Sequence, residues 1–364
     1  MSGWNWDALN VPERLALALA GAGARVLYCE NPVSFLRASG RALHEVQSNV
    51  FVLRPAFLSH RLNRNSRFAR LQAFVLRQQI VRAARRLGLK DPVFFYPHGE
   101  YCRSLAAEMK NRGFDLVHIC MDYELPGQLE HVRLSNITLA IPEAAFLELR
   151  RLFGAKIRKL PQFAAPNFPD AERGDAAQWQ TIEFSDIPTP RLMYLGDVEG
   201  RVNLELVKQV LDLHPEWHFI SFGSTNRLVQ SNSHALPWVS QNRWANLLTG
   251  DGVIGFLPYD CTDPKNLHCV PLKLFDYFAR GLPVVGTPIA YLREFPELVY
   301  LGNTAEELSE AIHLALEEPE DSPKRKRRLL VASEHSIDNL SRILSPLLVE
   351  EGGLSGRDGK VEKG

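Results

Sequence analysis

Two kinds of segment follow each other repeatedly along the chain. Short apolar runs rich in Val, Ile, Leu and Phe predict buried strands, and segments with apolar residues three and four positions apart predict helices between them. This alternation is typical of an α/β protein whose parallel sheets are covered by helices on both faces. The predicted strands are 25–30, 50–54, 92–97, 116–121, 138–141, 156–160, 192–195, 218–222, 253–257, 284–286 and 299–301, and the predicted helices are 11–22, 60–88, 100–112, 143–153, 202–213, 242–249, 271–280, 304–317 and 324–349.

The length of 364 residues exceeds that of one ordinary domain, so two domains are expected. The break falls near 165–190, where prolines are frequent and no apolar period is visible. We predict an N-terminal acceptor-binding domain over 1–168, a C-terminal donor domain over 186–322, a C-terminal helix over 323–350 and a disordered tail over 351–364.

The bulk composition excludes several classes of protein. Lys plus Arg and Asp plus Glu balance at 42 each, so net charge favours neither nucleic acid nor an acidic ligand. The five cysteines are scattered, as expected of reduced thiols in a cytosolic protein. No apolar run has the length of a membrane span, and no signal peptide is evident. These features predict a cytoplasmic protein.

The segment 271–288 carries the densest signal in the chain. Pro271 suits the first turn of a helix, and Gly281 suits its left-handed end. Lys273 and Asp276 lie three apart on one face of that helix. A helix start with a lysine suits a diphosphate, and a carboxylate one turn later can accept from ribose hydroxyls. The spacing alone fits an ion pair on a solvated face equally well.

Residues 271–285, Pro-Leu-Lys-Leu-Phe-Asp-Tyr-Phe-Ala-Arg-Gly-Leu-Pro-Val-Val, resemble the donor-binding helix of GT-B glycosyltransferases. The pattern is closest to the family-four and family-one-like enzymes, in the branch that includes the teichuronic-acid-type enzymes. Segments 191–197, 218–224 and 252–259 are similar to further strands of the donor domain. The resemblance implies two Rossmann-like domains with parallel sheets and a nucleotide sugar in the cleft between them.

Two features depart from the family's pattern. Many relatives have a glutamate eight residues before the ribose-binding glutamate, whereas this chain has His268 and Asp276. The family also opens with a buried strand, for which residues 1–7 leave no room. Either the N-terminal sheet lacks that strand, or the strand lies upstream of this start.

Open parallel sheets bind ligands beyond the carboxyl ends of their strands. Gly196 would let the backbone approach a phosphate, and Arg201 would reach the diphosphate or stay in solvent. Gly223-Ser224 would face the nucleotide, and the resemblance adds backbone contacts to the base near Val239. The predicted donor-binding residues are Gly196, Arg201, Gly223, Ser224, Val239, Lys273, Leu274 and Asp276.

The first domain should present the acceptor and the catalytic base. His98 follows one predicted strand and Asp122 follows the next, and either could take a proton. The alternatives are that His98 caps the following helix and that Asp122 is an N-cap or turn residue. His118 lies in mid-strand and is expected to be a core histidine with its hydrogen-bonding atoms satisfied.

Segment 59–90 holds eight arginines, one lysine and no acidic residue. Its apolar residues recur at helical spacing, which predicts a basic amphipathic helix suited to an anionic membrane surface. A lipid-linked acceptor would explain such a contact. The alternative is the solvated face of a packed helix.

The prediction is a glycosyltransferase that moves a sugar from a nucleotide-diphosphate sugar to an acceptor hydroxyl, in bacterial surface polysaccharide or glycolipid synthesis. The nucleotide sugar is a co-substrate, and no metal is expected because Cys261, His268 and Cys269 match no zinc spacing. Two rivals stay open: a non-catalytic nucleotide-sugar-binding module, and an epimerase or hydrolase on the same scaffold. The expected location is the cytoplasm, with the inner face of the membrane as an alternative.

Overall fold

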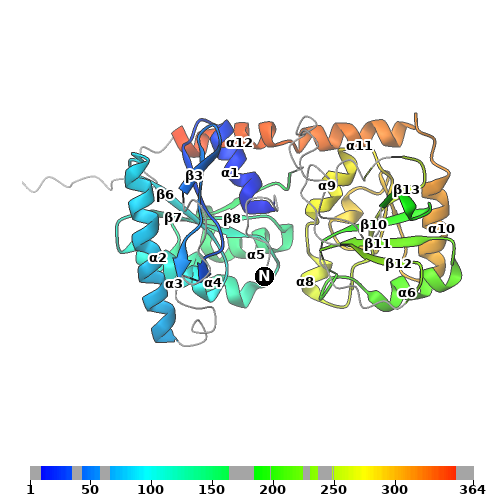
Figure 1. Ribbon diagram of the computed structural model, residues 1–364, viewed down its shortest axis with the longest axis horizontal. Helices are drawn as coiled ribbons and strands as arrows, with labels where there is room; N and C mark the ends of the chain where they lie inside the picture. Colours follow the sequence, from blue (N-terminus) through cyan, green and yellow to red (C-terminus); the bar gives the residue numbers. More distant parts are fainter. Residues whose placement is uncertain are drawn as a thin grey trace, which may run out of the picture. The chain divides into compact units, whose positions relative to one another are not determined.

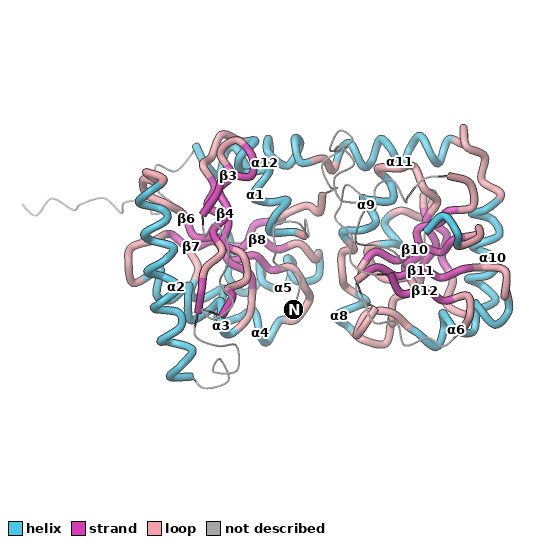
Figure 2. The backbone as a smooth tube through the Cα atoms, in the orientation of Figure 1, coloured by secondary structure: helices cyan, strands magenta, loops and turns pink. Residues whose placement is uncertain are grey.

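The computed structural model describes residues 10–34, 43–57, 66–163, 184–196, 198–223, 230–236, 248 and 250–349. The chain divides into two compact units. The first unit holds the residues up to Pro161 and those from Ile337 onward, and the second holds Gln162–Ser336. Each unit has strands in its interior and helices around them (Figure 2).

The first unit contains a parallel sheet in the order β6-β7-β8-β9. Its strands are β6 (Val93–Pro97), β7 (Asp115–Cys120), β8 (Ile137–Ala140) and β9 (Ile157–Lys159). All four were predicted. Five further strands are β1 (Val26–Cys29), β2 (Val33–Ser34), β3 (Leu43–Gln47), β4 (Val50–Leu53) and β5 (Ala56–Phe57).

One pairing in the first unit departs from the all-parallel prediction. β3 runs antiparallel to β4 at the edge of the sheet β1-β4-β3. Its polar residues alternate with apolar ones and leave it half-buried to exposed. An edge strand of this kind lacks the continuous apolar run by which buried strands are recognised.

The helices of the first unit are α1 (Val11–Gly21), α2 (Ser66–Arg86), α3 (Glu100–Lys110), α4 (Leu125–Leu134), α5 (Glu143–Phe153) and α12 (Ile337–Val349), with a 3₁₀ turn η4 (Gly154–Lys156). Helix α4 was not predicted. Its first turn contains Pro126 and Gly127, which have low helix propensity in general, although proline is tolerated at this position.

The second unit is built on one six-stranded parallel sheet in the order β12-β11-β10-β13-β14-β15. Its strands are β10 (Arg191–Leu195), β11 (His218–Phe222), β12 (Ser233–Leu236), β13 (Val253–Leu257), β14 (Val284–Gly286) and β15 (Val299–Leu301). This is the Rossmann order, in which the chain reverses direction across the sheet between its first and fourth strands. The reversal point lies between β10 and β13. Only β12 was not predicted, because Ser233 and His234 interrupt its apolar pattern.

The helices of the second unit are α6 (Leu204–Leu213), α8 (Pro264–Leu267), α9 (Leu272–Phe278), α10 (Ala305–Leu316) and α11 (Pro323–Glu334), with 3₁₀ turns η6 (Phe184–Asp186) and η7 (Leu292–Glu294). Helix α6 packs beside α10, and α9 packs beside α11 (Figure 1). The predicted helix at 242–249 lies almost wholly outside the described residues.

The prediction of one C-terminal helix over 323–350 was wrong. The chain forms two helices, α11 and α12, that belong to different units. Helix α11 packs on α9 in the second unit, whereas α12 packs on α1 in the first. Helical spacing continues through both segments, so the pattern does not show that the packing partner changes.

A buried ion pair between Arg328 and Glu318 stabilises the packing of α11 in the second unit. Arg328 is fully buried, and its two terminal nitrogens each donate to a Glu318 oxygen at 2.7 Å. Burial by itself would raise the pKa of Glu318, but the bonds from Arg328 and Ser322 outweigh it and hold the pKa below its ordinary value. The carboxylate form is therefore stabilised by folding.

We expect Glu318→Gln to destabilise the protein by about 2 kcal/mol at neutral pH. The folded pKa lies below the unfolded value of about 4.3, so the pair stabilises the fold above that pH. Its contribution disappears as the pH falls through the folded pKa. Urea denaturation from pH 7 to pH 3 should show that the difference in free energy of unfolding between wild type and variant becomes smaller in acid. If this difference stayed constant over the pH range, the Glu318 carboxylate would not be the source of the stabilisation.

Candidate functional site

The loop that follows β10 begins with a glycine at positive φ. Gly196 has φ +120°, a conformation that other residues rarely adopt. Its N–H donates to the carbonyl of Phe222 at 3.1 Å. A Cβ atom built at this glycine would lie 3.4 Å from the ammonium nitrogen of Lys273. The glycine loop and Lys273, far apart in sequence, therefore meet at the carboxyl end of β10.

Two tyrosines hold the Lys273 ammonium. Its nitrogen lies 3.6 Å from the centre of the Tyr194 ring and 5.9 Å from that of the Tyr259 ring, which are cation–π distances. Tyr194 belongs to β10, and Tyr259 follows β13. The ammonium thus lies at the reversal point of the sheet, the place where open α/β sheets bind ligands.

Helix α9 is fixed to the sheet by Tyr277, one turn beyond Lys273. The Tyr277 hydroxyl donates to the Met193 carbonyl at 2.8 Å and accepts from the Leu195 N–H at 3.1 Å. The ring packs directly on Gly255 of β13, where an added Cβ would come within 2.4 Å of it. These contacts set the position of α9, and with it the position of Lys273.

Asp276 and Leu274 of α9 were both predicted to bind the donor. Asp276 is only 5% exposed. Leu274 is fully buried in the apolar core, and its N–H donates to the Pro271 carbonyl at 3.2 Å. His268, which occupies the position of the missing first acid, is half-buried at the end of α8.

Arg201 lies in the loop between β10 and α6 and is half-buried. Its Nη1 is 3.5 Å from the Asn266 side-chain oxygen, and the Asn266 amide donates to the Gly200 carbonyl at 3.1 Å. The Arg201 carbonyl accepts from the Asp260 N–H at 2.9 Å. Asn266, which is 1% exposed, therefore ties the loop to α8.

Four residues of this site were not predicted from the sequence: Tyr194, Tyr259, Tyr277 and Asn266. Tyr277 stands four residues after Lys273, so helical spacing could have placed both on one face. Tyr194, Tyr259 and Asn266 carry no comparable signal, because each contacts a site residue that is distant in sequence.

The loop after β11 is described only at its start. Gly223 is exposed, has φ +87°, and donates its N–H to the Leu236 carbonyl at 3.0 Å. Ser224 and Val239, the other predicted donor-binding residues, lie outside the described residues.

In the first unit, His98 and Asp122 follow the neighbouring strands β6 and β7. The Nε2 atom of His98 is 3.5 Å from an oxygen of Glu124. Helix α3 has Gly99 as its N-cap, so the alternative in which His98 caps it is wrong. The Asp122 carbonyl accepts from the Glu124 N–H at 3.1 Å, which places Asp122 in a turn.

Two buried histidines, His118 of β7 and His131 of α4, lie side by side in the first unit. The rings of His118 and His131 are 5.2 Å apart. Desolvation lowers the pKa of His118 to about 3 and that of His131 to about 4, so both are neutral at physiological pH. His131 accepts from the Gly99 N–H at 3.2 Å and thereby holds the turn next to His98. The prediction that His118 is a core residue is confirmed by its complete burial. Its Nε2 atom is buried without a hydrogen-bond partner among the described residues, so the prediction that its polar atoms are satisfied is wrong for that nitrogen.

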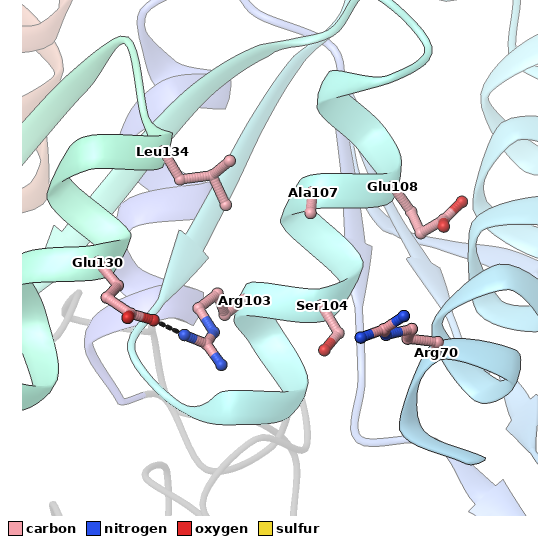
Figure 3. A pocket seen from close by; sticks show the side chains of 7 residues that line it. All are labelled: Arg70, Arg103, Ser104, Ala107, Glu108, Glu130 and Leu134. Atoms are coloured by element: carbon pink, nitrogen blue, oxygen red, sulfur yellow. Dashed lines mark ion pairs between the residues drawn. The ribbon is translucent and has the colours of Figure 1, made fainter. Parts of the chain in front are cut away.

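A pocket of about 350 Å³ opens in the first unit between α2, α3 and α4 (Figure 3). Its lining residues are Arg70, Arg103, Ser104, Ala107, Glu108, Glu130 and Leu134. Arg103 forms an ion pair with Glu130. None of the residues predicted to bind donor or to act in catalysis lines this pocket.

We expect Gly196→Ala to lower the free energy of unfolding by about 1–2 kcal/mol, because alanine is strained at this φ. The added methyl would also lie in contact with the Lys273 ammonium, 3.4 Å away, where the glycine leaves the backbone open to a phosphate. Gly200→Ala is the matched control: Gly200 has φ +70° but open space around it. Urea denaturation should show similar losses for both, and only Gly196→Ala should weaken nucleoside-diphosphate binding. Equal binding by the two variants would contradict the role of the contact.

Comparison with known proteins identifies the architecture. No family model and no curated protein matches the chain in sequence. Sucrose-phosphate synthase from Thermosynechococcus elongatus is similar in structure, with a TM-score of 0.64 and 12% identity over 93% of this chain and 92% of that one. The α,α-trehalose-phosphate synthase (UDP-forming) from Burkholderia vietnamiensis has a TM-score of 0.62 and 12% identity over 97% and 96%.

HepE from Anabaena, solved with UDP-glucose, has a TM-score of 0.59 and 12% identity over 93% of this chain and 96% of its own. The matches extend over nearly the whole length of both proteins in each case. The chain therefore has the GT-B fold with two Rossmann-like units, as the motif at 271–285 predicted.

Proposed function

We propose that this protein is a glycosyltransferase that moves a sugar from a nucleotide-diphosphate sugar to an acceptor hydroxyl. The observation that carries the proposal is the Lys273 ammonium, held beside Gly196 at the reversal point of the second sheet. A fixed cation at this point suits an anionic ligand whose charge grows during the reaction. The similar structure of HepE with UDP-glucose supports a nucleotide sugar as that ligand.

In the proposed donor site, Lys273 and Arg201 bind the diphosphate and Gly196 lets the backbone approach it. Asp276 accepts from the ribose hydroxyls, and Gly223, Ser224 and Val239 complete the nucleotide contacts. Leu274 supports the site from the core, since its side chain is buried.

The acceptor oxygen forms a bond to the anomeric carbon as the bond from that carbon to the diphosphate oxygen breaks. The electron pair leaves with the diphosphate, where Lys273 stabilises it. The acceptor proton passes to a base, for which we propose His98, with Asp122 as the alternative. Glu124 lies next to this base, with one carboxylate oxygen 3.5 Å from the Nε2 atom of His98. No metal is required for these steps, because the cationic side chains neutralise the leaving group.

For the acceptor we propose a sugar hydroxyl of a growing surface polysaccharide or glycolipid. The support is the likeness of residues 271–285 to the teichuronic-acid-type branch. Product analysis with short oligosaccharides and with lipid-linked sugars would separate the two classes.

The test is a panel of UDP-, GDP-, ADP- and dTDP-sugars, each incubated with and without an acceptor mixture. Transfer predicts nucleoside-diphosphate release that depends on the acceptor. Release or sugar isomerisation without any acceptor would favour a hydrolase or epimerase. Thermal stabilisation by a nucleotide sugar with no turnover under any condition would favour a binding module.

A further inference from the structure

The exposed face of α2 carries an apolar stripe. Phe68, Leu71 and Phe74 are 42%, 47% and 44% exposed, although the opposite side of the helix packs into the core through Ala73 and Leu76. Both of the large exposed phenylalanines among the described residues lie on this one helix. Adjacent exposed side chains of this kind mark interaction surfaces, whereas single ones are ordinary.

The same helix is strongly cationic. It contains six arginines and no acidic residue, in a chain whose total charge is zero. Arg77 is neutralised by Glu108 at 2.8 Å and lies over the Phe74 ring. Arg82, Arg85 and Arg86 are exposed, about two to three turns beyond the apolar stripe on the same side of the helix.

We propose that this face of α2 binds the surface of an anionic lipid membrane. The phenylalanines and Leu71 would enter the boundary between headgroups and acyl chains, as the apolar face of an interfacial helix does. The exposed arginines would meet lipid phosphates, to which guanidinium groups bind in bidentate fashion.

The position of α2 in the first unit is compatible with contact to a membrane surface. Helix α2 runs along the outside of the first unit, beside α3 (Figure 1). Arg70 lies between Phe68 and Leu71 in the sequence and lines the open pocket next to α3 (Figure 3). None of the described helices is long and apolar enough to span a bilayer, so α2 would provide a contact at the surface. The proposal goes beyond the proposed reaction and does not depend on it.

The test is flotation of the purified full chain with two kinds of vesicle, phosphatidylcholine alone and phosphatidylcholine mixed with phosphatidylglycerol. Wild type should float with the anionic vesicles, and added salt should weaken this binding. The variant Phe68→Ser/Leu71→Ser/Phe74→Ser should lose binding at least about tenfold. The variant Arg82→Gln/Arg85→Gln/Arg86→Gln should lose on the order of 100-fold on anionic vesicles, since each arginine contributes about fivefold.

The matched control is Leu147→Ser/Leu152→Ser on α5, where two leucines are 58% and 50% exposed outside the cationic face. The control should bind as wild type does. The proposal is overturned if wild type ignores the anionic lipid, or if the control loses as much binding as the α2 variant. It is also overturned if light scattering shows that the apolar stripe joins two copies of the chain and no variant changes flotation. If the apolar variant misfolds, flotation of wild type and of the arginine variant still tests whether α2 binds anionic membranes.

Discussion

Replacing Lys273 with alanine should abolish thermal stabilisation by nucleoside diphosphates and lower kcat/KM by about 10²–10³-fold. The ammonium lies over the Tyr194 ring and beside Gly196, so its removal leaves the proposed leaving group without its main fixed cation. The loss should appear mostly in kcat, because charge on the diphosphate grows as the sugar departs. Thermal shift with a nucleoside-diphosphate panel and steady-state kinetics would measure the two effects.

Lys324→Ala provides the matched control. The Lys324 ammonium also lies over a tyrosine ring, at 4.2 Å from the centre of Tyr300, but on α11 and exposed. This variant should retain both nucleotide stabilisation and turnover. If Lys273→Ala kept its response to every nucleoside diphosphate, the proposed donor site would be wrong, whereas the fold would stand.

Gly255→Ala should destabilise the second unit by about 3 kcal/mol. The added methyl would lie 2.4 Å from the Tyr277 ring, and this ring cannot move freely because its hydroxyl is bonded to Met193 and Leu195 on the adjacent strand. Relief of the clash would therefore break bonds to two buried backbone groups and displace α9. Urea denaturation followed by tryptophan fluorescence would measure the loss.

Gly127→Ala is the control for the glycine substitution itself. Gly127 lies in α4, and an added Cβ there would meet no atom within 4 Å. Alanine should leave the stability unchanged or raise it by up to about 1 kcal/mol, because it is the better helix former. A Gly255→Ala protein as stable as this control would show that Tyr277 does not fix α9 to the sheet.

The local pattern of the sequence predicted most of the fold. The five strands predicted between 190 and 302 all form within one or two residues of their expected ends, because burial of a short apolar run depends mainly on the run itself. The donor motif led to Lys273, Asp276 and the GT-B architecture. Edge strands β3 and β12 were missed because they are only partly buried.

What depends on distant pairing could be decided only by the tertiary structure. The order of the second sheet places β10 next to β13, and only this order brings Gly196, Tyr194 and Lys273 to one point. In the same way, the helical pattern after 323 could not show that α11 and α12 pack in different units. The periodicity of apolar residues indicates which side of a segment is buried. Which other element packs on that side depends on the free energy of the whole folded chain.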